Sequence, residues 1–383
     1  MADLLIKQAK VNGAIVDIEV TGSTISAIGP SLQSNAAQII EANQGITIPG
    51  FVDAHTHLDK SLLQPASPYV DGTGPEKGKL TLARKQGFTK ADIKARASQM
   101  IERAIQAGTL IWRTNVDVDP SVGLQGIEAL LELRDEYKDR IQLQVVAFAQ
   151  EGVFTDPSIP GLLRQALERG ADAVGGHTII AGEGKPHIDL ILGLAKEFNV
   201  EADFHLDESG NLDHYLLPYV AEQMIALGLQ GKVNGIHCCT LGNVDEATLA
   251  SAIEAIKASQ LKITVAPTAI STRVLAPAKQ LREAGVLMSV GTDNLRDFFN
   301  PLGSGDVRDV ALLLGYVQRF FTTDQVADLV SMITTQGAQL LGVAYGLQVG
   351  GPAHITVLPA QTNEELLAYR DAPTAIIRQG ILL

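Results

Sequence analysis

The chain has 383 residues, of which 46% are hydrophobic and 19% are charged. This composition is typical of a globular protein with a large core and excludes a disordered chain. The 43 acidic residues outnumber the 30 Lys and Arg, which leaves a net charge of −13. Because an acidic surface repels phosphate groups, we expect neither a nucleic-acid partner nor a membrane partner.

The sequence has no feature of a membrane-spanning or secreted protein. No run of about 18 uninterrupted apolar residues predicts a membrane-spanning helix. The opening MADLLIKQAKVNG lacks the basic region and long apolar stretch of a secretory signal. Cys238 and Cys239 are neighbours in the chain, which makes them poor disulfide partners. We therefore expect a cytoplasmic protein.

Short β segments are predicted at both ends of the chain. Turn pairs such as Asn12-Gly13 and Thr21-Gly22 separate the first of them, as in hairpins. The segments are Asp3–Val11, Ile15–Val20, Ser23–Ile28, Gln38–Ile40, Ala353–Leu358 and Thr374–Leu383. Segments at opposite ends of a chain can pair with each other across a domain inserted between them.

Between these ends, short apolar runs of strand length alternate with amphipathic helical stretches. The eight runs are Ile46–Ala54, Thr109–Val118, Ile141–Ala149, Ala171–Gly176, Val200–His205, Lys232–His237, Lys262–Ala266 and Val286–Thr292. This alternation predicts an α/β fold, a closed (β/α)8 TIM barrel. An open doubly wound sheet is the alternative, but no Gly-rich phosphate loop follows the first strand.

Two connecting segments carry further local signals. Lys90–Ala107 has a helical apolar stripe, with Thr89 as the expected N-cap and Gly108 just past the expected end. The connection from Asp59 to Phe88 is long and rich in Pro, Gly and mixed charge. Because long loops in compact domains are commonly functional, we expect it to form a lid over the site.

Histidines gather where the predicted strands end. In such barrels active sites lie at the carboxyl ends of the strands. His55 and His57 end the first run, two residues apart, so both rings project to one face and can reach one ion. His205 and His237 end two later runs, and His177 follows another and could line the pocket. The others, His187, His214 and His354, are expected to be surface or structural residues.

Several strand-end segments together resemble a known family. They are PGFVDAHTHLDK (49–60), RTNVDVD (113–119), QVVAFAQEG (144–152), HLDE (205–208) and GTDN (291–294). This set is similar to the amidohydrolase superfamily and, within it, to the cytosine deaminase group. The resemblance spans nearly the whole chain. It implies that residues 1–50 and 345–383 form one small β-sandwich domain beside a catalytic barrel of residues 51–344.

The resemblance also implies roles for single residues. The ligands of one divalent metal ion would be His55, His57, His205 and Asp293. Glu208 would carry protons, and His237 would act beside the metal-bound water. Three more residues would contact the substrate: Gln150 at the amide edge of the ring, Phe299 against the ring, and Asn294 where cytosine deaminase has an acidic residue.

The chemistry of these residue types agrees with those roles. Three neutral imidazoles and one carboxylate leave a dication an open position for water, whose pKa falls to roughly 7. The resulting hydroxide can add to the carbon that bears the amino group, with Asp293 or His237 accepting the proton. Glu208 can then protonate the ring nitrogen and the leaving amine. The amide of Gln150 offers one donor and one acceptor, which match a pyrimidone-like edge.

The sequence leaves the metal and the ring open. No lysine ends the fourth run, so we expect one ion, which could be iron, zinc or manganese. Asn115 and Asn294 depart from the deaminase pattern. The stretch 293–298 looks more like relatives that remove alkylamino groups from triazines, such as N-isopropylammelide amidohydrolase. Those relatives lack a glutamate at the position of Glu208.

We therefore expect a deaminase of a small N-heterocycle such as cytosine or a related aminopyrimidine, which releases ammonia and forms a homo-oligomer. Alternatives are a hydrolase of amino- or alkylamino-triazines, a hydrolase of creatinine-type or isocytosine-type rings, and a non-catalytic scaffold.

Overall fold

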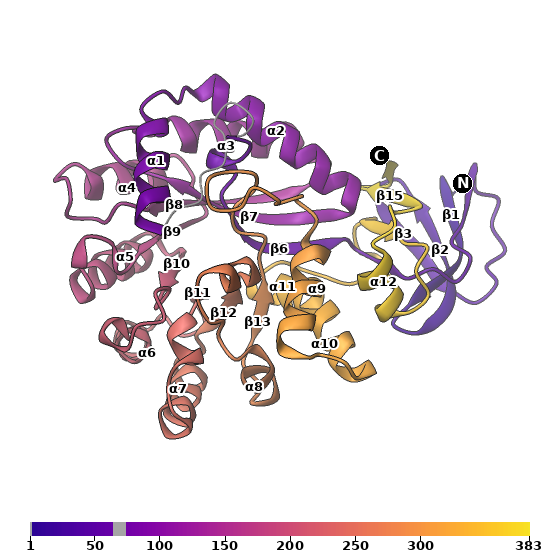
Figure 1. Ribbon diagram of the computed structural model, residues 1–383. Coiled ribbons are helices and arrows are strands. Elements are labelled where there is room, and N and C mark those ends of the chain that lie inside the picture. The colour runs from indigo at the N-terminus through magenta and orange to yellow at the C-terminus, as the bar shows by residue number, and fades with distance from the viewer. Residues whose placement is uncertain (1, 64–73) are drawn as a thin grey trace.

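Eight parallel strands in consecutive order form the centre of the computed structural model, which describes residues 2–63 and 74–383. Helices lie around the outside of this sheet (Figure 1). The strands are β6 (Phe51–Thr56), β7 (Thr109–Asp117), β8 (Gln142–Ala149), β9 (Ala173–His177), β10 (Glu201–Leu206), β11 (Val233–His237), β12 (Lys262–Val265) and β13 (Met288–Val290). The predicted TIM barrel is confirmed.

In the described part of the chain, helices lie between successive barrel strands, with two after β6 and three after β13, and one more helix lies nearer the carboxyl end. They are α1 (Gly74–Lys85), α2 (Lys90–Ala107), α3 (Gln125–Tyr137), α4 (Ile159–Glu168), α5 (Lys185–Phe198), α6 (Leu217–Leu227), α7 (Glu246–Ser259), α8 (Ala278–Glu283), α9 (Val307–Gln318), α10 (Thr323–Met332), α11 (Thr335–Leu340) and α12 (Asn363–Tyr369). Short 3-10 turns are η1 (Leu58–Lys60), η2 (Ile180–Gly182), η3 (Leu212–His214), η4 (Cys239–Gly242) and η5 (Pro267–Ser271). Among the described residues, no helix has both the length and the apolar character needed to cross a bilayer.

Helix α2 has the bounds that the sequence predicts. The Thr89 side chain accepts a hydrogen bond from the backbone N–H of Asp92, and Gly108 ends the helix in the left-handed conformation. Its apolar stripe, which includes Ile93, Met100 and Ile101, is buried in the hydrophobic core between the barrel strands and the surrounding helices. Capping and burial therefore agree along this helix.

The first barrel strand begins later than the sequence predicts. Residues 47–48 form the short strand β5 of another sheet, and β6 begins at Phe51. Pro49 has no N–H to give to a sheet, and Gly50 has a φ of 130°. A Cβ at Gly50 would lie 2.8 Å from Leu110, so only glycine fits this corner. The Pro-Gly pair separates the two strands.

We expected the connection from Asp59 to Phe88 to be one long loop, but the structure shows otherwise. It begins with η1 and contains the twelve-residue helix α1, while its residues 64–73 lie outside the described part. Pro75 lies in the first turn of α1, where a missing N–H costs nothing. The sequence does not predict this helix, because it contains two glycines and too few apolar residues to form a helical stripe.

The barrel closes between its last and first strands at the position of Asp293. The backbone N–H of Asp293 donates to His55 O at 2.9 Å, and the N–H of His57 donates to Asp293 O at 3.2 Å. Just before, a Cβ on Gly291 would lie 2.7 Å from both Cβ and O of His55. Glycine at 291 therefore permits the close approach that completes the barrel.

Two small sheets lie beside the barrel and share one core. The first has the order β3-β2-β1-β4 and the second the order β16-β15-β14-β5. Their strands are β1 (Leu4–Val11), β2 (Ala14–Thr21), β3 (Thr24–Gly29), β4 (Gln38–Glu41), β5 (Thr47–Ile48), β14 (Ile355–Val357), β15 (Ala375–Arg378) and β16 (Ile381–Leu382). Ile6 and Ile18 pack with Ile355 and Ile377 in this core. Both chain ends therefore meet in one small domain (Figure 1).

A buried ion network crosses the lumen near the start of the strands. Arg113 on β7 donates to Asp203 at 2.9 Å and to Glu201 at 2.8 Å, both on β10, and to Gln144 on β8 at 2.9 Å. Since β7 and β10 are not neighbours in the sheet, these bonds pass through the interior. Arg113 therefore connects opposite walls of the barrel.

We predict that Arg113→Met destabilises the protein by about 3–5 kcal/mol, because it leaves buried carboxylates without their main partner. Urea unfolding measures this loss. The matched control is Arg164→Met, which removes an exposed pair with Glu197 and should cost less than about 1 kcal/mol. Equal losses of unfolding free energy in the two variants would show that the interior ion network does not stabilise the barrel more than a surface ion pair does.

Candidate active site

Four histidines and one aspartate converge at the carboxyl ends of the barrel strands. His55 and His57 come from the end of β6, His205 from β10 and His237 from the end of β11, while Asp293 follows β13. The ring centroid of His55 lies 4.9 Å from that of His57 and 5.0 Å from that of His205. The rings of His205 and His237 are 4.8 Å apart. Side chains from residues far apart in the sequence thus meet in one cluster.

The Asp293 carboxylate faces the two histidines of β6. Its Oδ1 lies 3.2 Å from Nε2 of His55 and 3.5 Å from Nε2 of His57. Ligand atoms of His55, His57 and His205 all lie within 4.8 Å of one another, as do those of His55, His237 and Asp293. Every side chain in these two groups is buried.

The histidine donor atoms fit a cation. Nε2 of His205 and both ring nitrogens of His237 are buried and have no hydrogen-bond partner in the described part of the chain. Buried polar atoms without partners are rare and costly. Burial lowers the pKa of His57 and of His237 to about 4, and the pKa of His205 well below its ordinary value. The rings are therefore neutral near pH 7, the state in which imidazole binds a metal ion.

Contacts behind the cluster orient its members. Nδ1 of His57 lies 3.2 Å from Asn115 O. This contact selects the tautomer with the hydrogen on Nδ1, which leaves the electron pair of Nε2 free to bind a metal ion. Asp53 accepts hydrogen bonds from the backbone N–H of His55 and from the hydroxyl of Thr292. Burial raises the pKa of Asp53 to about 6, against those hydrogen bonds. These contacts hold the first and last strands in register around the cluster.

Four non-glycine residues at the strand ends adopt the left-handed backbone conformation. They are Asp207, His237, Cys238 and Asp293, with φ between 47° and 72°. Such conformations cost free energy and are maintained where the surrounding structure determines them. Here they turn the chain sharply after β10, β11 and β13. The turns bring the side chains of these segments to the barrel mouth.

The carboxylate of Glu208 has basic groups on both oxygens. Oε2 lies 2.8 Å from Nε2 of His177 and 3.2 Å from Nδ1 of His205, and Oε1 lies 2.6 Å from Nη2 of Arg273. Burial opposes the ionised form, but the guanidinium of Arg273 and the hydrogen bond from His177 outweigh it and hold the pKa of Glu208 well below its usual range. Glu208 is therefore ionised, and its Oε2, which can accept a proton, faces the histidine cluster.

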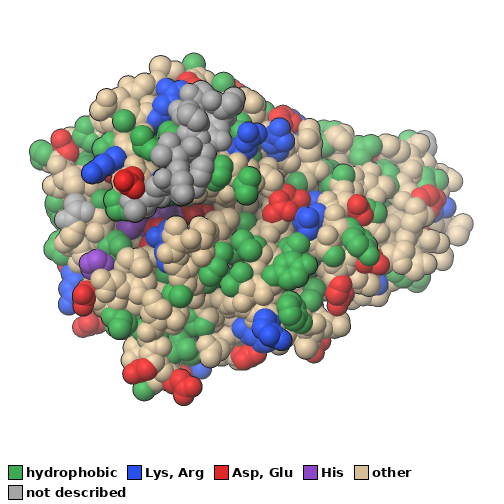
Figure 2. All heavy atoms as spheres, viewed as in Figure 1, with side chains coloured by type: hydrophobic (Ala, Val, Ile, Leu, Met, Phe, Trp, Pro, Cys, Tyr) green, Lys and Arg blue, Asp and Glu red, His purple; other side chains and the backbone are tan. Residues whose placement is uncertain are grey.

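A cavity of about 1010 Å³ opens above this cluster. Its lining includes His57, His177, His205, Glu208, His237 and Asp293, together with the three residues expected to contact a substrate, Gln150, Asn294 and Phe299. Acidic and histidine side chains are visible in the hollow on the face shown in Figure 2. The structure thus brings every site residue predicted from the sequence except His55 to the lining of one cavity, and His55 lies buried against His57, His205 and Asp293.

The three predicted substrate contacts differ in how firmly they are held. The side chain of Asn294 donates to Asp297, and Asn294 O accepts a bond of 2.9 Å from the side chain of Asn300. Phe299 is exposed at the rim, whereas Gln150 is half-buried directly after β8. Asn115, the other departure from the deaminase pattern, lies buried below the cluster with no partner for its amide atoms in the described chain.

A buried ion cluster attaches helix α1 to the barrel mouth. Nζ of Lys85 lies 2.8 Å from Asp117, 2.6 Å from Asp119 and 3.2 Å from Glu151. Lys60 adds a bond of 2.6 Å to Asp117. Burial opposes the charge on Lys85, but these carboxylates raise its pKa. Since residues of α1 line the cavity, this cluster fixes one of its walls.

Sequence reasoning missed Arg273 and the role of Lys85. Neither residue lies at a strand end, so the reading of strand ends could not select them. His177 was expected to be able to line the pocket, and it does. His187 is buried and pairs with Glu183 at 2.8 Å, a structural contact. Cys238 and Cys239 are free, as their adjacency predicts, and both are buried.

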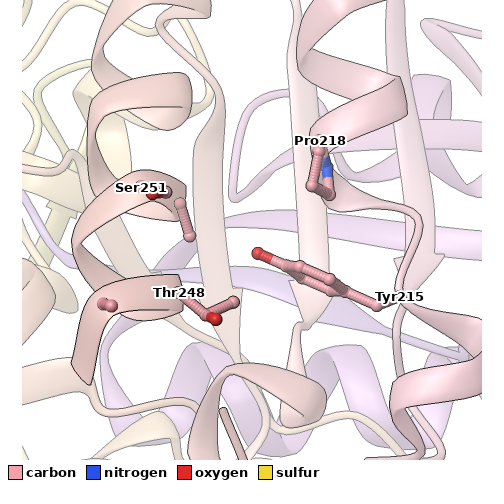
Figure 3. Close-up of a pocket in the computed structure, with 6 residues that line it drawn as sticks. Tyr215, Pro218, Thr248 and Ser251 are labelled. Atoms are coloured by element: carbon pink, nitrogen blue, oxygen red, sulfur yellow. The ribbon is translucent and has the colours of Figure 1, made fainter. Parts of the chain in front are cut away.

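A second hollow, of about 370 Å³, lies outside the barrel between α6 and α7. Figure 3 shows the Tyr215 side chain extending into it between Pro218 on one helix and Thr248 and Ser251 on the other. The remaining lining residues are alanines. Because the lining holds no carboxylate, imidazole or cationic group, this hollow offers no metal ligands and no acid–base pair.

Comparisons with known proteins agree with the geometry. A sequence model of the Amidohydrolase family matches residues 46–380. The N-isopropylammelide isopropyl amidohydrolase of Pseudomonas sp. (strain ADP) is 32% identical, over 100% of this chain and 97% of its own.

Two solved structures are similar over almost the full length. The N-isopropylammelide isopropylaminohydrolase from Burkholderia multivorans ATCC 17616 has a TM-score of 0.91 at 28% identity and covers 100% of this chain and 98% of its own. The 5-methylcytosine deaminase from Klebsiella pneumoniae, liganded with phosphonocytosine, has a TM-score of 0.92 at 26% identity, with 99% and 97% covered.

We predict that Lys85→Met loosens α1, because Asp117 and Asp119 lose their shared cation and repel each other. Amide hydrogen exchange should become faster across residues 74–85, as measured by mass spectrometry of peptides. Lys94→Met is the control, since Lys94 pairs with Glu132 and Glu136 on the outer surface. Unchanged protection of α1 in Lys85→Met would show that the ion cluster does not hold this helix.

Proposed function

This chain belongs to the amidohydrolase family, and we propose that it is a metal-dependent deaminase of an amino-substituted N-heterocycle such as cytosine or a related aminopyrimidine. The family makes it a hydrolase acting on carbon–nitrogen bonds. In the proposed reaction water adds to the ring carbon that bears the amino group, and ammonia leaves. Similarity to a deaminase structure and to an amidohydrolase of a substituted triazine supports an N-heterocyclic substrate.

One observation carries the choice of deamination. The carboxylate of Glu208 lies in the cavity wall, within 3.7 Å of His177, His205 and His237. Loss of ammonia from an aromatic ring needs a proton on a ring nitrogen and another on the leaving nitrogen. A carboxylate that takes up one proton and returns it supplies both steps. Glu208 has this position beside the histidine cluster.

The proposed metal ligands are His55, His57, His205 and Asp293. The partnerless Nε2 of His205, the neutral rings of His57 and His205, and the close spacing of the ligand atoms of His55, His57 and His205 support this set. A divalent ion bound there supplies Lewis acidity, which makes water a nucleophile at neutral pH. Iron, zinc and manganese all suit such a donor set, and we propose a single ion.

The other residues bind the ring and move protons. His237, with a neutral imidazole, accepts a proton from the attacking water together with Asp293. Gln150 presents one donor and one acceptor to an N–H and a C=O of the ring. Phe299 packs against the ring face, and the amide of Asn294 contacts its edge. All five groups line the same cavity.

A second candidate function is hydrolysis of an alkylamino group on a triazine ring. It is favoured by the 32% identity to the N-isopropylammelide relative over the whole chain. The cavity of about 1010 Å³ also exceeds what a single six-membered ring needs. In that reaction the leaving group is an alkylamine instead of ammonia, and the nature of the amine distinguishes the two functions.

We also propose the sandwich domain of residues 1–50 and 345–383, the catalytic domain of residues 51–344, a homo-oligomeric state and a cytoplasmic location. The shared core of the two small sheets supports the division of the chain.

We predict ammonia release from at least one of cytosine, isocytosine, 5-substituted cytosines, creatinine and ammelide, tested with manganese, zinc and iron. A coupled ammonia assay measures this activity, and N-isopropylammelide with detection of isopropylamine tests the second candidate. Isopropylamine release alone would transfer the assignment to the triazine reaction. No amine from any of these compounds, in protein that carries an ion, would overturn both.

We predict that Glu208→Gln lowers turnover by about 10²–10⁴-fold while the bound metal stays, because the amide cannot carry a proton. Steady-state kinetics and metal analysis by mass spectrometry measure the two quantities. Glu254→Gln, on the exposed side of α7, is the control and should match the parent protein. Full activity in Glu208→Gln would remove Glu208 from proton transfer.

The contrasting variant is His55→Ala, which should lose the ion along with activity. His214→Ala is its control, since His214 lies on the exposed turn η3. A metal-replete, active His55→Ala protein would contradict the ligand set.

A further inference from the structure

We propose that Arg273 is a positioning residue for Glu208, which holds the carboxylate in the orientation that proton transfer requires. This inference rests on the proposed function, because it assigns Glu208 the proton-carrying role. It concerns a residue outside the strand-end set, which reaches the site from the segment that follows η5.

The contacts of Glu208 divide between its two oxygens. Oε2 faces the imidazole rings, at 2.8 Å from Nε2 of His177, 3.2 Å from Nδ1 of His205 and 3.7 Å from Nε2 of His237. Oε1 has one ion-pair partner in the described part of the chain, Nη2 of Arg273 at 2.6 Å. Arg273 therefore holds the oxygen that the rings do not hold.

Two contacts on two oxygens determine the plane of a carboxylate, whereas contacts on one oxygen leave it free to rotate. A glutamate side chain loses rotamer freedom when both of its oxygens are held. Proton transfer at two points of a ring requires hydrogen-bond distance at both. The guanidinium restricts the rotation that would move Glu208 away from one of these points.

The contact also joins segments that follow two non-neighbouring strands of the barrel. Glu208 follows β10, and His177 ends β9, so these two are on neighbouring strands. Arg273 comes from the connection between β12 and α8, two strands beyond β10. Its side chain is 28% exposed and lines the cavity. Within the described residues, Glu208 is the one carboxylate within ion-pair distance of Arg273.

Positioning of Glu208 differs from direct binding of the substrate in its kinetic signature. A residue that acts through Glu208 changes kcat, because it affects proton transfer more than substrate affinity. A residue that holds the ring equally before and during the reaction changes KM alone. The short contact of Nη2 with Glu208 favours the first.

The test uses metal-replete Arg273→Ala and Arg273→Lys, with Arg282→Ala as control, since Arg282 pairs with Asp328 on the outside. We expect Arg273→Ala to lower kcat by about 10²-fold, with KM within about 3-fold of the parent value and the metal content unchanged. Arg273→Lys should keep more activity, because it retains a cation. Added methylguanidinium should raise kcat of Arg273→Ala at least tenfold and leave the control unchanged.

A crystal structure of Arg273→Ala supplies a readout that does not need activity. We expect the Glu208 carboxylate to be rotated or disordered there, with His55, His57, His205 and Asp293 in place. An unmoved Glu208 would overturn the proposal, as would an increase in KM at constant kcat. If Arg273→Ala does not fold, Arg273→Gln, which removes the cation but keeps a polar side chain, takes its place: parent kcat would overturn the proposal, and reduced kcat at parent KM would support it. If the parent protein releases no amine, the proposed function fails and the position of Glu208 alone decides the role of Arg273.

Discussion

The geometry of the site depends on how the barrel closes. The backbone of Asp293 pairs with His55 and His57, so the same contact that joins the last strand to the first sets the spacing of three proposed ligands. Gly291 permits this approach because a side chain there would collide with His55. Asp53 reinforces it through Thr292. A barrel that failed to close would therefore lose the cluster of proposed metal ligands. The site thus depends on the closure of the fold.

A second constraint is the separation of charged and neutral groups at the mouth. The imidazoles of His57 and His237 are neutral near pH 7, because burial lowers the pKa of both. The fixed cations lie to either side, with Lys85 and Lys60 in the acidic cluster and Arg273 on Glu208. The centre thus keeps free electron pairs for a cation, while the surrounding ion pairs hold the walls that shape the cavity.

The sequence predicted the barrel, α2 and the convergence of strand-end side chains because each has a local signal. Eight strands that alternate with helices, with no Gly-rich phosphate loop after the first strand, favour a closed parallel sheet, and parallel strands place their ends at one edge. Helix α1 and Arg273 have no such signal. The fixing contact of α1 is a buried lysine among carboxylates from β7 and β8, and Arg273 meets Glu208 only through the tertiary fold. Long-range electrostatic contacts of this kind cannot be read from spacing in one sequence.

The pairing of β5 with β14 has a consequence for biosynthesis. About 300 residues separate these strands, so a ribosome adding about 5–20 residues per second needs roughly 15–60 s between them. During that interval the amino-terminal sheet of the sandwich has its apolar face uncovered, since Ile355 and Ile377 do not yet exist as part of the nascent chain. The barrel strands are all complete before the second sheet can assemble. Between the synthesis of residues 4–25 and that of residues 355–377, the emerging polypeptide therefore exposes an apolar face that is prone to aggregation.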